Sequence, residues 1–256
     1  MITLPEKEKG GYWTPLEKEW RDYFLSPITF LFRPFSGAAN AITFLGFAIL
    51  AAAMIDFFRF GSFERQIWFI LAAWLTDFLD GPTARNNSHV TPFGTAADFV
   101  RDDVLGIWML AVSFLAIKAN GGYASLYLLV ALTLLGKFAI AAAIWLYGRE
   151  KRRERPDQPF SIFFHEFIMK DFVTTVTARI HTFILAAGGI AVIAGAAWGN
   201  PYSELGIGLL LLQLLTLGFY LHELFEAQYE DKAYRLRVAF KEKINELEER
   251  RRERRR

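Results

Sequence analysis

The sequence contains no cysteine. Neither a disulfide framework nor a thiolate-bound metal site can therefore form. The N-terminal stretch MITLPEKEKGGYW also lacks a basic region followed by an apolar run. We therefore expect no cleaved signal peptide. No internal repeat is evident along the chain, so nothing points to a repeat architecture.

Apolar residues are abundant instead. Hydrophobic residues make up 53% of the 256 positions, and the mean hydropathy is +0.22. This is too apolar for an ordinary soluble domain, especially because the two ends of the chain are polar. From Asp231 to the end, eleven Lys or Arg residues stand against six Asp or Glu residues. The composition predicts a membrane protein with a basic C-terminal tail.

Six stretches are long and apolar enough to cross a bilayer, which takes about 20 helical residues each. They cover residues 39–60, 65–86, 93–117, 122–147, 172–198 and 204–226. The second and third have short apolar portions, so they can span only as parts of longer helices whose charged ends face a polar cavity. We predict an all-α integral membrane fold with six transmembrane helices over residues 38–228, followed by a tail over residues 229–256.

The loops indicate an orientation. The segment Gly148–Pro159 holds five cations and the tail eleven, whereas the outer loop GNPYS has none and KANGG has one. The positive-inside rule therefore places the N-terminus and the tail in the cytoplasm.

The N-terminal segment 1–37 has a helical signature of its own. Thr14-Pro15-Leu16-Glu17 is typical of a capping box, and Leu16, Trp20, Tyr23 and Phe24 then repeat on one side. We predict an amphipathic helix on the cytoplasmic membrane surface, which Pro27 ends or kinks. The alternative is a helix that packs on the protein core.

A dense acidic motif lies across the second and third predicted helices. It reads D-x2-D-G-x2-A-R-x8-G-x3-D-x3-D, and its fixed positions are Asp77, Asp80, Gly81, Ala84, Arg85, Gly94, Asp98 and Asp102. In a helix these residues form one-sided stripes. The eight-residue connection between Arg85 and Gly94 lets the two helices run antiparallel. The four carboxylates are therefore expected to converge near the cytoplasmic side.

Such a cluster needs compensating positive charge. Each ionised carboxylate in a bilayer helix costs about 2.5–3.5 kcal/mol, and Arg85 and Arg101 can offset two at most. Oxygen ligands without histidine or cysteine favour Mg²⁺ or Mn²⁺, and two such ions suit a diphosphate substrate. Small residues at Gly81, Ala84 and Gly94 leave room for a polar ligand, although close helix packing also explains glycines in membranes. Asp103 lies off the stripe and is expected to be structural.

The motif resembles the signature of the CDP-alcohol phosphotransferases at all eight fixed positions. Asn40-Ala41-Ile42-Thr43 also looks like the Pro-Asn-x-x-Thr element of that family, with Ala39 in place of proline. The resemblance implies an enzyme of phospholipid biosynthesis in the cell membrane, with its site on the cytoplasmic side. It would transfer a phosphatidyl group from a CDP-alcohol such as CDP-diacylglycerol to an alcohol, release CMP, and form a homodimer.

The resemblance also assigns roles to the motif residues. The metal ligands would be Asp77, Asp80, Asp98 and Asp102, and Asp102 would also be the general base. The CDP pocket would be lined by Gly81, Ala84, Arg85 and Gly94, with Arg85 near the diphosphate.

Two further cations lie at the depth of the acidic motif. With a rise of about 1.5 Å per residue, Lys137 and Arg179 are roughly 10–16 Å from the inner ends of their helices, as is Asp77. They are candidates to bind a phosphorylated acceptor, and pairing with carboxylates is the alternative. The segment Thr177–Gly189 is loosely similar to the inositol-phosphate branch of the family. The Lys-x-Arg-Ala-Glu element of glycerol-phosphate users is absent around Lys137.

Other classes of protein fit the sequence less well. A divalent-cation transporter needs polar groups along several spans, whereas these charges gather on one side. A metal-bearing scaffold accounts for the carboxylates but not for Gly81, Ala84 and Gly94. We expect the partners to be a CDP-alcohol lipid, a small alcohol and membrane lipids, and we expect no nucleic acid.

Overall fold

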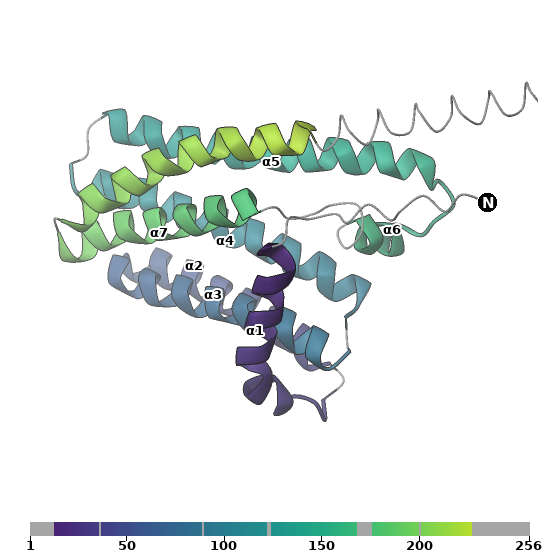
Figure 1. Cartoon of the computed structure of the whole chain (residues 1–256). Helices are drawn as coiled ribbons and strands as arrows, with labels where there is room; N and C mark the ends of the chain where they lie inside the picture. Colours follow the sequence, from purple (N-terminus) through teal and green to yellow (C-terminus); the bar gives the residue numbers. More distant parts are fainter. Residues whose placement is uncertain are drawn as a thin grey trace, which may run out of the picture.

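The computed structural model describes residues 13–35, 37–88, 90–121, 124–167, 176–199 and 201–226, and these ranges are mostly helical and contain no strand (Figure 1). The helices are α1 (Trp13–Phe30), α2 (Ala38–Phe60), α3 (Phe63–Asn86), α4 (Pro92–Ala119), α5 (Ala124–Glu154), α6 (Phe160–Glu166), α7 (Val176–Trp198) and an unlabelled last helix, Tyr202–Glu226. The predicted basic tail over residues 229–256 lies outside the described residues.

The six predicted apolar helices coincide with α2, α3, α4, α5, α7 and the last helix, apart from a few residues at their ends. The main difference is α5, which continues to Glu154 through half of the predicted inner loop. Lysine, arginine and glutamate are good helix formers. In addition, the cations Lys151, Arg152 and Arg153 in the last turn interact favourably with the helix dipole. The short helix α6 in the same region was not predicted.

The protein is an all-α membrane protein. Among the described residues, four helices are long and apolar enough to cross a bilayer: α2, α5, α7 and the last helix. The 24 residues of α3 and the 28 of α4 also exceed the roughly 20 that a span requires. Their charged residues dilute their hydropathy, so the six-span arrangement stays a prediction.

Helix α1 crosses the long helices steeply and lies against α3 (Figure 1). It continues past Pro27 to Phe30, so this proline does not end the helix. Leu25 and Thr29 are buried, whereas Tyr23 and Phe24 are exposed. An exposed aromatic side fits the predicted amphipathic character, and a position on the membrane surface stays a prediction. The side chains of Leu16 and Trp20 lie outside the described part.

Two caps set where the motif helices begin. The Ser62 hydroxyl accepts a hydrogen bond from the Arg65 amide at the start of α3. The Thr91 hydroxyl accepts one from the Gly94 amide at 3.0 Å, with Pro92 at the first position of α4. These contacts satisfy amides that a helix N-terminus leaves unpaired. They fix the registers in which α3 and α4 present the acidic residues.

The apolar core is built from α2, α3, α4, α5, α7 and the last helix. Its most buried members include Leu50, Ile70, Leu110, Val112, Ile193 and Leu210. One polar group inside it, Gln66, accepts from the Trp108 indole at 3.1 Å and donates to the Ala53 carbonyl at 3.0 Å. Because its amide is hydrogen-bonded, this buried glutamine joins α2, α3 and α4 without a large desolvation cost.

The contact between α7 and the last helix depends on a glycine. A Cβ atom on Gly206 would lie 2.5 Å from the backbone nitrogen of Val192 and 3.0 Å from the carbonyl carbon of Ala191. At Gly208, two residues further on, nothing lies within 4 Å of that position. The two glycines therefore form a matched pair of sites.

We expect Gly206→Ala to lower the melting temperature of the purified protein in detergent by several degrees, because overpacking costs about 1–3 kcal/mol. Gly208→Ala should leave it unchanged or slightly higher, since alanine is the better helix former. Equal melting temperatures for the two variants would contradict the close approach of the two helices.

Candidate active site

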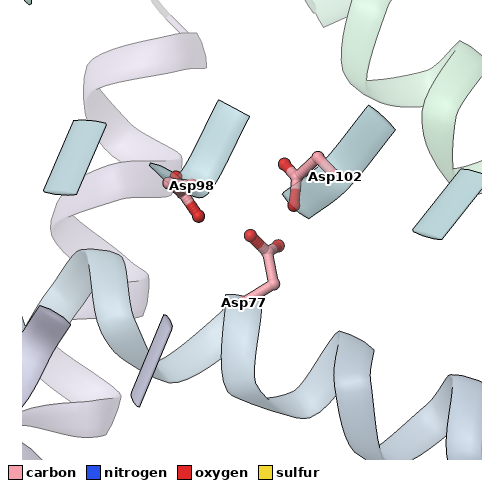
Figure 2. Close-up of side chains that lie close together, drawn as sticks. All are labelled: Asp77, Asp98 and Asp102. Carbon is pink, nitrogen blue, oxygen red and sulfur yellow. The ribbon is translucent and has the colours of Figure 1, made fainter. Parts of the chain in front are cut away.

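Three carboxylates converge between α3 and α4. Asp77 projects from α3 toward Asp98 and Asp102 on α4 (Figure 2). One oxygen from each lies within 4.8 Å of the other two. Within the described residues this is a group of acidic side chains with the spacing that a shared cation requires. The side chains of Asp98 and Asp102 are 40% and 51% exposed, so a ligand can reach them.

Asp80 lies beside this group rather than in it. Its side chain is buried, and it accepts a hydrogen bond from the Thr43 hydroxyl at 2.8 Å. It also accepts from Nη1 of Arg101 at 2.5 Å. The predicted convergence of four carboxylates therefore takes the form of three facing oxygens with a fourth, buried carboxylate next to them.

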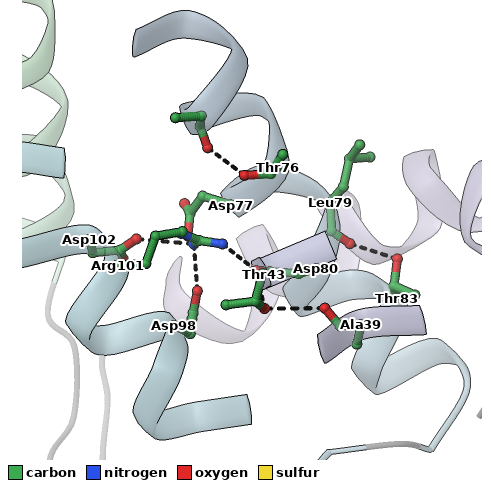
Figure 3. A network of polar contacts seen from close by, with 11 residues as sticks. Ala39, Thr43, Thr76, Asp77, Leu79, Asp80, Thr83, Asp98, Arg101 and Asp102 are labelled. Atoms are coloured by element: carbon green, nitrogen blue, oxygen red, sulfur yellow. Dashed lines mark hydrogen bonds and ion pairs between the residues drawn. The ribbon is translucent and has the colours of Figure 1, made fainter. Parts of the chain in front are cut away.

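Arg101 connects all four carboxylates (Figure 3). Its side chain is 0% exposed and enters between α3 and α4. From the sequence, Arg101 is expected only to be one of two cations that could offset the negative charge of the carboxylates. The sequence does not predict that a single guanidinium meets every carboxylate, because that depends on where the helices approach one another.

The other motif arginine has a different partner. Arg85 donates from Nε and Nη2 to the two carboxylate oxygens of Asp22 on α1, both at 2.7 Å. A Cβ on Gly81 would lie 3.2 Å from Nη1 of Arg85, so Arg85 passes over this glycine. Sequence reasoning missed Asp22, because nothing in its spacing relates it to the motif.

The remaining small residues differ in their surroundings. A Cβ on Gly94 would meet the side-chain oxygen of Asn40, and it would lie 2.9 Å from the hydroxyl of Thr91. Close packing therefore accounts for glycine at this position. Ala84 is partly buried on α3, one turn after Asp80.

The two candidate acceptor-binding cations are on different helices. Lys137 on α5 pairs with Asp103 at 2.8 Å, and its side chain lies over Gly106, where a Cβ would come 2.7 Å from Cε. The ion pair places Lys137 beside the residue that follows Asp102, and it is a pairing with a carboxylate of the kind given above as the alternative to acceptor binding. The structural role of Asp103 stays a prediction. Arg179 is partly buried on α7. A pair of opposite charges at one depth in apolar helices is the signal by which the Lys137–Asp103 contact could have been found.

These features define a helical membrane protein with an acidic site built on two neighbouring helices. The family model described as CDP-alcohol phosphatidyltransferase matches residues 37–221, well over half of the chain and the whole acidic motif. The chain therefore belongs to the CDP-alcohol phosphatidyltransferase family. It is a phosphotransferase of phospholipid biosynthesis that transfers a phosphatidyl group from a CDP-alcohol, as the motif predicts. No curated protein and no solved structure matches the chain.

The hydrogen bond from Thr43 to Asp80 allows a test with a close control. Thr43→Val removes the donor, and a hydrogen bond to a charged group contributes about 1.5–3 kcal/mol. We expect kcat/KM for the CDP-alcohol to fall about tenfold or more, because Asp80 loses its orientation. Thr133→Val should leave kcat/KM near the wild-type value, since the hydroxyl of this similarly buried threonine donates to the Leu129 carbonyl of its own helix. Equal kcat/KM values would show that Thr43 does not support the site.

Proposed function

We propose that the enzyme transfers the phosphatidyl group of CDP-diacylglycerol to a phosphorylated alcohol and releases CMP. The observation that carries the proposal is the meeting of the Asp77, Asp98 and Asp102 carboxylates between α3 and α4 (Figure 2). Carboxylates in this arrangement suit a substrate that arrives as a diphosphate with cations.

The donor set fits a divalent metal, which the family uses. In the proposal, Asp77, Asp80, Asp98 and Asp102 hold Mg²⁺ or Mn²⁺, with two ions at the site. A cationic atom already lies among them, because Nη2 of Arg101 contacts an oxygen of Asp77, Asp98 and Asp102. When bound, the ions would neutralise the diphosphate and the charge that develops on the leaving CMP.

The CDP moiety is proposed to lie against Gly81, Ala84, Arg85 and Gly94. The contact of Arg85 with Asp22 supports this assignment, because two parallel N–H···O bonds to a carboxylate use the same fork that grips a phosphate. The diphosphate would therefore take the place of Asp22 at Arg85.

Asp102 is proposed as the general base. Its side chain is half exposed, whereas Asp80 is buried, so an acceptor hydroxyl can approach it. Asp102 takes the proton of that hydroxyl while the acceptor oxygen attacks the β-phosphorus. The bond from this phosphorus to the oxygen bridging to CMP breaks, and CMP leaves with the electron pair.

The acceptor is proposed to be inositol phosphate, held by Lys137 and Arg179. Two cations on apolar helices suit an alcohol that carries its own phosphate, and the ion pair with Asp103 holds Lys137 beside the residue that follows Asp102. Glycerol phosphate is the second candidate. We further propose a homodimer in the plasma membrane with the site on its cytoplasmic side. Metal transport has no support from the family match.

The central test uses purified protein with Mg²⁺, CDP-diacylglycerol and a panel of alcohols, with CMP release as the readout. We expect CMP with inositol phosphate and none with Asp102→Asn, because an amide cannot accept the proton. That variant should still bind part of the metal and nucleotide. Activity that survives in Asp102→Asn would remove Asp102 from the role of base. If no acceptor gave CMP and the protein carried metal ions into liposomes, the proposed transferase activity would be contradicted.

The acceptor site is tested by separating the two Michaelis constants. Lys137→Met and Arg179→Met should raise the acceptor KM about tenfold or more and change the donor KM little. Lys137→Met leaves the Asp103 carboxylate without its cation. The double variant Lys137→Met/Asp103→Asn controls for this effect by removing both charges of the ion pair. Lys118→Met, which removes an exposed lysine at the far end of α4, should match the wild type. Equal increases in both constants would argue against acceptor binding at these residues.

A further inference from the structure

Arg101 is not one of the eight motif positions. It lies at a variable position between Asp98 and Asp102, yet its guanidinium forms ion pairs with all four motif carboxylates. Its side chain is 0% exposed. Four carboxylates and one guanidinium leave a formal charge of −3, so the arginine offsets the cluster only in part.

The hydrogen bonds of this guanidinium are unevenly used. Nη1 donates to Asp80, whereas Nη2 has three acceptors, Asp77, Asp98 and Asp102, for its two N–H groups. The Nε atom is buried and has no hydrogen-bond partner among the residues that the structure describes. A guanidinium offers five donors in a rigid fork. Nη2 therefore has more acceptors than N–H groups, whereas Nε has no acceptor in the described part of the chain. This mismatch indicates that the positions of the carboxylates are not set by the donors of the guanidinium alone.

The aliphatic part of the Arg101 side chain nevertheless packs closely against α2. A Cβ on Gly46 of α2 would lie 2.7 Å from Cδ of Arg101 and 2.6 Å from the hydroxyl oxygen of Thr76. Any side chain at position 46 would therefore displace the arginine or Thr76. The packing of α2 against α3 and α4 therefore positions this guanidinium next to the carboxylates.

The three oxygens grouped for a cation belong to the same residues that surround Nη2, namely Asp77, Asp98 and Asp102. A metal ion bound by these three oxygens, which lie within 4.8 Å of one another, would have to share them with Nη2. Two positive centres so close also repel each other strongly where water is scarce. Binding of one must weaken binding of the other.

We propose that Arg101 is the resident counter-ion of the site. It holds the four carboxylates together in the metal-free protein, competes with the divalent cation for Asp77, Asp98 and Asp102, and thereby sets the metal affinity. Arg101 is a positioning residue, since it acts through the carboxylates. The inference rests on the metal site of the proposed function.

The test measures Mn²⁺ binding to the full chain in detergent by electron paramagnetic resonance. Arg101→Met should bind Mn²⁺ about tenfold or more tightly than the wild type, because a competing charge is gone. Its melting temperature in EDTA should fall, and Mg²⁺ should raise that temperature by more than it does in the wild type. Arg101→Lys keeps a charge without the fork and should bind with intermediate affinity.

Arg65→Met is the matched control. Arg65 lies in the first turn of α3, away from the motif, and forms an ion pair with Asp56 at 3.4 Å. It should match the wild type in Mn²⁺ affinity and in the response to Mg²⁺.

Unchanged or weaker Mn²⁺ binding by Arg101→Met would overturn the inference, and so would equal losses of melting temperature in EDTA and in Mg²⁺. If that variant does not fold, Arg101→Lys decides, because unchanged or weaker binding there overturns the inference as well. A wild type that binds no Mn²⁺ would instead overturn the metal centre of the proposed function, and the competition with it.

Discussion

The structure depends on keeping four carboxylates close together within a bundle of apolar helices. Taking charges out of water is expensive, and like charges at short range repel one another. The surrounding features reduce this cost: the Thr43 hydroxyl on Asp80, the Arg101 guanidinium among all four, and the caps that set the registers of α3 and α4. These contacts therefore allow the acidic faces of the two motif helices to lie against each other.

Each of three cations near the site is paired with a carboxylate. Arg85 meets Asp22, Lys137 meets Asp103, and Arg101 meets the motif carboxylates. A cation held in this way does not stand unpaired in a low-dielectric environment before substrate arrives. Under the proposed function, a phosphate or a metal ion would replace one of these contacts when it binds. The existing contacts would keep the side chains preorganised, whereas each contact that is given up would weaken the binding of the ligand that replaces it.

Much of the fold was predictable because helix periodicity and apolar length are local properties. The six apolar helices were found to within a few residues, and the family followed from the eight spaced motif positions. The extension of α5 to Glu154 was not found, because charged residues that favour a loop by composition also favour a helix by propensity. Within the described ranges, four helices are long and apolar enough to cross a bilayer, and α3 and α4 are not among them because the motif charges lower their hydropathy.

The sequence by itself determined the class of protein, the identity of the acidic residues and the helix faces they occupy, because residue spacing along a helix sets which side chains share a side. Only the tertiary structure decided which cation meets which carboxylate. Asp22 and Arg85 are distant in sequence, and so are Asp103 and Lys137. Their pairing depends on how α1 approaches α3 and α4 approaches α5, which is a property of packing between helices rather than of any one of them.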